Sequence, residues 1–196
     1  FKRSKRRSTL PVNNWNFSHL GTITLRKGFS ESINTTAVRT LMDVGEDRMR
    51  DLTHRLGITD LRQGDCGPTI TLGACEVKLV DQTFAFAVLA NNGVMKGRPT
   101  SEDLPTGFRE LDQVSVLSIS DSDGNVLYQF TAPNEVQVID PAYAYMATDV
   151  LSKDAITWSA LTIDRPAATK TGNSEEFRDN VVMGYTHDLS IGVWMG

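Results

Sequence analysis

Residues 165–196 read RPAATKTGNSEEFRDNVVMGYTHDLSIGVWMG, and this stretch gives the clearest indication of the fold. Its pattern predicts strands over residues 167–174, 179–185 and 189–195, separated by turn-forming polar residues. Connections this short favour antiparallel neighbours. We therefore expect the chain to end in a three-stranded antiparallel meander.

Helical periodicity comes before these strands. Residues 1–21 lack it, and a short helix or turn is expected over residues 22–29. Longer helices are expected after Asn34 with Thr35 and Thr36 as the cap, from Glu46 to Gly57, over residues 76–91, and from Asp140 onward. Helices first and strands last predict an α+β fold, with helices packed on an antiparallel sheet.

Apolar residues at helical spacing indicate the faces that these helices bury. In the helix over residues 76–91, the expected buried stripe is Val77, Val80, Phe84, Ala87 and Val88. In the helix that starts at Asp140, it is Ile139, Tyr143, Met146 and Val150.

Strand-like alternation also marks residues 114–119 and 126–130, and the turn between them contains Asp121, Asp123 and Asn125. These three residues resemble the start of a calcium loop. That motif requires Gly at its sixth position and Glu at its twelfth, where this chain has Val126 and Ala132. A β-hairpin is therefore the prediction.

Composition indicates one domain with an ordinary soluble core, since 40% of the 196 residues are hydrophobic and 22% are charged. A net charge of −4 gives no general attraction for nucleic acid, and the basic cluster at residues 2–7 is interpreted as a solvated surface segment. The three histidines are scattered and none has metal-ligand spacing, so no metal site is expected. Cys66 and Cys75 are too few for a disulfide scaffold, but they could pair if the protein is exported.

Three blocks of sequence carry a resemblance. One is Lys170-Thr171-Gly172 within the stretch quoted above. Another runs from Gly21 to Arg26 and continues to Ser32-Ile33-Asn34, and a third runs from Leu72 to Val77 and on to Ala90–Gly93. In this order and spacing, the blocks resemble the transpeptidase domain of class A penicillin-binding proteins over about residues 11–196.

The resemblance implies acyl transfer through a serine ester on D-Ala-D-Ala stem peptides, which β-lactams mimic. Ser32 would relay protons, and Asn34 would hold the substrate's backbone amide and help to position the lysine of a Ser-x-x-Lys motif. Lys170 would supply positive charge near Ser32 and the substrate's terminal carboxylate. The substrate would be bound by Thr171, Gly172, Asn173 and Ser174. The backbone N–H of Asn173 would be one donor to the oxyanion. Asn173 departs from the Thr or Ser that this family usually has there.

The chain has no Ser-x-x-Lys, the motif whose serine is the nucleophile in this family. Only Thr24 and Cys75 stand three residues before a lysine as conceivable nucleophiles, and neither is credible in its context. In the family that motif precedes Ser-x-Asn by several tens of residues, so it would lie before Phe1 unless the parent protein lacks it. Residues 1–196 are then a single, partial transpeptidase domain, truncated at its N-terminus and inactive by itself.

The resemblance also implies a bacterial parent protein with a glycosyltransferase domain and a membrane anchor outside this chain, acting on the outer face of the cytoplasmic membrane. It implies no metal and no organic cofactor. Its partners would be peptidoglycan stem peptides and β-lactams, with a companion segment or chain that carries Ser-x-x-Lys. Three alternatives remain open. They are a non-catalytic module that binds cell-wall peptides, a β-lactamase or D,D-carboxypeptidase relative, and a scaffold domain in which the motifs are relics.

Overall fold

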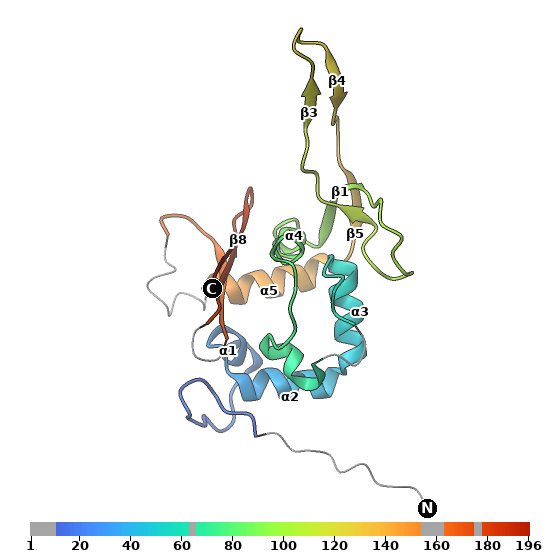
Figure 1. Cartoon of the computed structure of the whole chain (residues 1–196). Helices are drawn as coiled ribbons and strands as arrows, with labels where there is room; N and C mark the ends of the chain where they lie inside the picture. The colour runs from blue at the N-terminus through green and yellow to red at the C-terminus, as the bar shows by residue number, and fades with distance from the viewer. Residues whose placement is uncertain (1–10, 63–65, 154–162, 175–177) are drawn as a thin grey trace, which may run out of the picture.

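The computed structural model of the chain describes residues 11–62, 66–153, 163–174 and 178–196. Helices occupy most of its first half (Figure 1). They are α1 (Leu25–Ser30), α2 (Asn34–Val44), α3 (Glu46–Leu56), the 3-10 helix η1 (Gly67–Leu72), α4 (Leu79–Ala90) and, later in the chain, α5 (Pro141–Lys153). Among the described residues, no helix is both long and apolar enough to cross a membrane.

The strands of the described residues form three separate antiparallel sheets. One has the order β2-β1-β5, a second is the hairpin β3-β4, and the third has the order β6-β7-β8. Their bounds are β1 (Val94–Pro99), β2 (Leu111–Asp112), β3 (Ser118–Ser120), β4 (Val126–Gln129), β5 (Asn134–Gln137), β6 (Ala168–Asn173), β7 (Asn180–Tyr185) and β8 (Ser190–Met195).

The C-terminal sheet β6-β7-β8 confirms the predicted meander, with each strand within one residue of its expected bounds. Lys170 lies opposite Met183, and Met183 lies opposite Gly192. Side chains directly opposite one another share a face of a sheet, so Lys170 is on the same face as the buried Met183. This is the face that the helices cover, and the predicted α+β fold is confirmed.

Helices α4 and α5 lie side by side on that face, α4 over β7 and β8 and α5 over β6. An added Cβ at Gly192 would stand 2.2 Å from Thr83 Oγ1, so glycine lets α4 approach β8 closely. The buried residues of the two helices are Asp81, Ala85, Val88, Ala144 and Leu151. In α4 the predicted stripe is buried or half-buried except for Val80, which is 57% exposed. In α5 the prediction was wrong for Tyr143 and Met146, which are 66% and 61% exposed.

The strand predicted at residues 114–119 corresponds to β3 of the hairpin β3-β4 and begins only at Ser118. Sheet β2-β1-β5 was not predicted. Arg109 stands beside this sheet and is 6% exposed. Its guanidinium donates to Asp112 Oδ1 at 2.9 Å, to Asp81 Oδ1 at 3.3 Å and to the Gly57 carbonyl at 2.9 Å. These bonds and a hydrogen bond from Gln113 Nε2 offset the free-energy cost of burying the Asp81 carboxylate beside the Arg109 guanidinium.

The start of α2 differs from the prediction. Thr35 and Thr36 lie inside the helix rather than capping it. The side-chain oxygen of Asn14 takes the capping role by accepting from Thr35 N at 3.1 Å and from Thr35 Oγ1 at 3.0 Å. Beside α2, Cys66 and Cys75 form a disulfide and pack against a core of Leu41, Leu61 and Ile70.

Candidate functional site

The turn that carries Ser32 joins α1 to α2. Ser32 N donates to Phe29 O at 3.3 Å, and Ile33 N donates to Gly28 O at 2.9 Å. This is the bonding pattern of a Schellman helix end, in which the left-handed position is usually glycine. Here that position is Ser32, with a φ of 54°. Non-glycine residues held in strained backbone conformations, as Ser32 is here, cluster at functional sites.

Close packing between the two helices fixes this turn. An added Cβ at Gly28 would stand 2.4 Å from Thr36 Cγ2, so only glycine lets α1 approach α2 this closely. Ile33, next to Ser32, is 3% exposed and anchors the turn in the interior. The Ser32 side chain therefore projects from a turn whose backbone is held on both sides.

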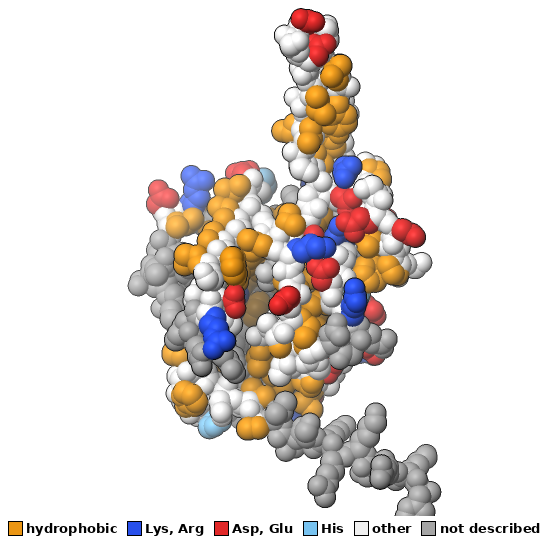
Figure 2. Space-filling view, in the orientation of Figure 1, with side chains coloured by type: hydrophobic (Ala, Val, Ile, Leu, Met, Phe, Trp, Pro, Cys, Tyr) orange, Lys and Arg blue, Asp and Glu red, His pale blue; other side chains and the backbone are white. Residues whose placement is uncertain are grey.

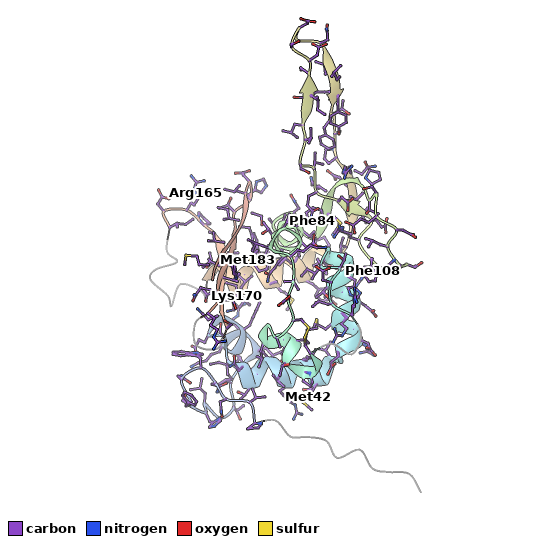
Figure 3. All side chains as sticks on the ribbon, in the orientation of Figure 1. Met42, Phe84, Phe108, Arg165, Lys170 and Met183 are labelled. Atoms are coloured by element: carbon purple, nitrogen blue, oxygen red, sulfur yellow. A yellow bond between two sulfur atoms is a disulfide. The ribbon has the colours of Figure 1, made fainter. Side chains whose placement is uncertain are left out.

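Lys170 reaches this turn from β6, and Figure 3 shows it on the C-terminal sheet next to α1. Its Nζ donates to Ser32 Oγ and to the Thr171 carbonyl oxygen, the latter at 2.7 Å. Burial lowers the pKa of Lys170 from its ordinary value, since a desolvated ammonium is disfavoured. The fold thus brings together two predicted residues separated by 138 positions in sequence.

Helix α5 links the two halves of the site through adjacent residues. Asp149 pairs with Arg26 of α1, with 2.6 Å between Oδ2 and Nη2. The hydroxyl of Thr148 lies 2.8 Å from that of Tyr185 in β7. One helix therefore contacts both the helix before the Ser32 turn and the sheet that carries Lys170. Neither sequence motifs nor residue spacing predicted these two contacts of α5.

The outer edge of β6 is open in the described part of the chain, because β6 pairs with β7 only. Gly172 is exposed, and a Cβ added to it would meet no atom within 4 Å. Asn173 donates through its side-chain amide to Asn180 across the β6–β7 pair. Ser174 Oγ accepts from Asp179 N at 2.8 Å and so helps to close the turn. A chain laid along β6 would meet no side chain at Gly172.

Asn34 is the first residue of α2, but its side-chain amide points toward the lead-in segment. Its Nδ2 donates to Asn13 O at 2.9 Å. Asn34 and Asn14 therefore both tie residues 13–14 to the start of α2. Contact of Asn34 with a substrate or with a catalytic lysine stays a prediction. In the described ranges, no cluster of three or more His, Cys, Asp or Glu side chains could hold a metal ion.

Curated relatives match the chain over nearly its whole length, although no protein-family model matches it. Penicillin-binding protein 1A of Rickettsia bellii is 28% identical over 194 residues, which cover 93% of this chain and 24% of that protein. Penicillin-binding protein 1A of Aquifex aeolicus is 27% identical over 196 residues, covering 98% of this chain and 24% of that protein. The chain thus spans about a quarter of the length of these relatives.

Solved structures share the fold. Penicillin-binding protein PonA1 of Mycobacterium tuberculosis matches with a TM-score of 0.72 at 23% identity, over 93% of this chain and 50% of that one. Penicillin-binding protein A of the same organism, as its imipenem acyl-enzyme complex, gives 0.74 at 16% identity, over 97% and 46%. A D,D-transpeptidase domain of a peptidoglycan glycosyltransferase from Eggerthella lenta gives 0.63 at 16% identity, over 88% and 47%. The resemblance carried by the three sequence blocks is confirmed.

Proposed function

Because the chain has the fold of part of a penicillin-binding transpeptidase domain, we propose that it supplies one side of a peptidoglycan D,D-transpeptidase site. In such a site a serine ester carries the acyl group from a D-Ala-D-Ala stem peptide to an amine. The observation that carries the proposal is the contact between Lys170 and Ser32 beside the open edge of β6. The nucleophile would come from a Ser-x-x-Lys segment outside these 196 residues.

The charge state of the site supports this role. Within the described residues, no carboxylate pairs with the half-buried ammonium of Lys170. A desolvated cation without a counter-ion favours an anionic ligand, and the terminal carboxylate of a stem peptide is such a ligand. Ser32 Oγ both accepts and donates hydrogen bonds, so it can pass a proton between Lys170 and a leaving amine.

The strand edge supports the same ligand. A peptide that adds to β6 would gain main-chain hydrogen bonds from an existing strand, and Gly172 leaves room for it. Thr171 and Ser174 would contact the peptide's carboxylate end, and Asn173 N–H would donate to the oxyanion. Ser174 Oγ already accepts one hydrogen bond, but a hydroxyl retains a donor for a ligand.

The disulfide between Cys66 and Cys75 supports a location outside the cytoplasm, because disulfides persist in oxidising compartments. We place the site on the outer face of a bacterial cytoplasmic membrane, in a longer protein with a glycosyltransferase domain and a membrane anchor. β-Lactams are its expected covalent ligands, in line with the imipenem acyl-enzyme of a structural relative.

The test compares two polypeptides, this chain alone and a longer product of the same gene that includes a Ser-x-x-Lys motif. On incubation with a fluorescent penicillin, we expect covalent labelling of the longer product only. Within it, Lys170→Met and Ser32→Ala should each slow acylation by roughly a hundredfold, the loss typical for a proton-transfer group. Lys96→Met is the matched control, because Lys96 pairs with Glu135 on the separate sheet β2-β1-β5.

Each result distinguishes the alternatives. A covalent adduct on this chain alone would show that the nucleophile lies within its 196 residues and would overturn the proposal. Reversible binding of a D-Ala-D-Ala peptide, without acylation of any longer gene product, would favour the non-catalytic binding module. Rapid hydrolysis of penicillin with no amine transfer would favour the β-lactamase or carboxypeptidase relative.

A further inference from the structure

The hairpin β3-β4 projects from the rest of the molecule as an arm (Figure 1). We define the arm as residues 117–130. Strands β3 and β4 contact each other, and neither makes extensive contact with another described element. A two-stranded hairpin by itself is marginally stable in water, and stable hairpins usually pack one face against a partner. One face of the arm is therefore expected to pack against a partner.

The two faces of the arm differ in chemistry. Ile119 lies opposite Tyr128, and Phe130 N donates to Leu117 O one step further along. Cross-strand partners share a face, as do residues two apart on one strand. Leu117, Ile119, Tyr128 and Phe130 therefore share one apolar face, and Ser118 and Gln129 lie on the opposite, polar face. Beyond Ile119 the register shifts, so that Val126 lies opposite Ser120 and Leu127 has no directly opposite partner.

The apolar face is open to solvent. Leu117 is 65% exposed, Ile119 49% and Tyr128 41%. Figure 2 shows hydrophobic side chains along the arm and acidic side chains at its tip. Large apolar side chains gathered on one protruding element mark an interaction surface more often than scattered exposed residues do.

The arm has a fixed shape before any partner arrives. Asp121 Oδ1 accepts from the N–H groups of Asp123 at 3.0 Å and Asn125 at 2.8 Å, and Asp121 Oδ2 accepts from Asn125 Nδ2 at 2.9 Å. These bonds close the turn and hold both strands in register. A pre-formed hairpin loses less conformational entropy on binding than a flexible loop would.

The charge of the arm and its surroundings indicates which kind of partner would bind its apolar face. Residues 110–152 contain no Lys or Arg, and the arm tip carries Asp121 and Asp123. On neighbouring β1, Lys96 and Arg98 already face Glu135 and Asp112, at 2.9 and 3.9 Å. A second arm or an anionic lipid surface would therefore meet like charge, whereas a basic surface would meet opposite charge.

We propose that the apolar face of the arm is the docking surface for a protein partner that presents an apolar groove bordered by Lys and Arg side chains. The proposal is independent of the transpeptidase assignment, because it uses no residue of the Ser32–Lys170 site.

The test uses the isotopically labelled chain and two short peptide probes. One alternates Val with Lys, and the other has Glu in place of each Lys. We expect the Lys peptide to shift the backbone amide resonances of residues 117–130, and the Glu peptide to leave them unchanged. Raising the salt from about 50 mM to about 500 mM should weaken the binding, because it shortens the screening length.

Two variants add the same charge on opposite faces. Ile119→Asp should weaken binding of the Lys peptide by about tenfold or more, because it removes a central apolar contact. Ser118→Asp, on the polar face, should bind at least as tightly as the unmodified chain. Both positions are exposed, so neither substitution removes a core contact.

Several outcomes would overturn the proposal. They are equal responses to the two peptides, unchanged binding by Ile119→Asp, and resonance shifts confined to other residues. Self-association of the chain through the arm at about 1 mM, read by sedimentation, would assign the face to a second copy instead. Binding to phosphatidylglycerol vesicles through the arm would assign it to a membrane.

Discussion

The Ser32–Lys170 junction and the β3-β4 arm are built in opposite ways. At the junction, residues 138 positions apart meet, one of them in a left-handed conformation and the other half-buried. In the arm, the longest pairing spans little more than a dozen residues, and the turn is closed by the side chain of Asp121. The junction depends on packing from several elements, whereas the arm depends on local hydrogen bonds.

This difference predicts which substitutions will change the stability of the whole chain and which will change only binding. A residue that holds the junction should affect global stability, because the elements around it share the core. A residue on the arm should affect binding and leave stability almost unchanged. The following predictions test that contrast, from the largest expected effect to the smallest.

Gly28→Ala should lower the free energy of unfolding by about 2 kcal/mol, because its Cβ would overlap Thr36 Cγ2 at 2.4 Å. Chemical denaturation measures the change. Adding Thr36→Ser removes the overlapping methyl group and should restore part of the loss. If the double variant is no more stable than Gly28→Ala alone, the close approach of α1 and α2 is not the cause.

Ser32→Gly should be more stable than Ser32→Ala by about 1 kcal/mol, because only glycine adopts the left-handed conformation without a steric cost. Both variants lose the hydroxyl that Lys170 contacts, so their difference isolates the backbone term. Thermal denaturation of the pair measures it. Equal stability would indicate that the serine at this helix end is not strained.

Lys170 should titrate below the ordinary lysine pKa, because burial disfavours its ammonium form. Since the folded pKa lies below the unfolded one, the free energy of unfolding should rise with pH between the two values. Ser32→Ala removes an acceptor that stabilises the ammonium and should lower this pKa further. NMR titration of labelled lysine side chains, with Lys170→Arg to assign the signal, measures both effects. A pKa that rises in Ser32→Ala would contradict the hydrogen bond.

Leu127→Ala on the arm should change the free energy of unfolding by less than about 0.5 kcal/mol, because Leu127 is 68% exposed. Ala144→Leu on α5 is the contrasting variant, since Ala144 is 1% exposed and larger side chains at well-packed positions typically destabilise by about 1–3 kcal/mol. Comparable destabilisation by the two substitutions would show that the arm is part of the core after all.

Much of the local structure followed from sequence because short-range physics decides it. Gly45 and Gly57 end α2 and α3, and Asp140 accepts from Ala142 N at the start of α5, as predicted. The hairpin turn at residues 121–125 was also predicted correctly. In each case the decisive interactions lie within a few residues, so the sequence window contains both partners.

The errors came from partners far away in sequence. Helix α5 offers two apolar stripes, and the one with Ala144 and Leu151 is buried. Its packing against α4 and β6, which lie far away in sequence, decides which stripe faces the interior. In α4 the buried face includes Asp81, which no hydrophobic pattern selects, because Arg109 arrives from 28 residues away to pair with it. Asn14 caps α2 from 21 residues upstream.

The sequence by itself determined the motifs, the strands that carry Lys170, the helix ends and the turn of the arm, because each depends on residue type and on neighbours along the chain. The resemblance predicted that Ser32 and Lys170 share one site, and the contact between them confirms this. Only the tertiary structure decided that Asn34 binds Asn13 and that the arm's apolar face is exposed among the described residues. Those outcomes depend on which surfaces come together in space, and the chain reaches them only when distant elements pack against each other.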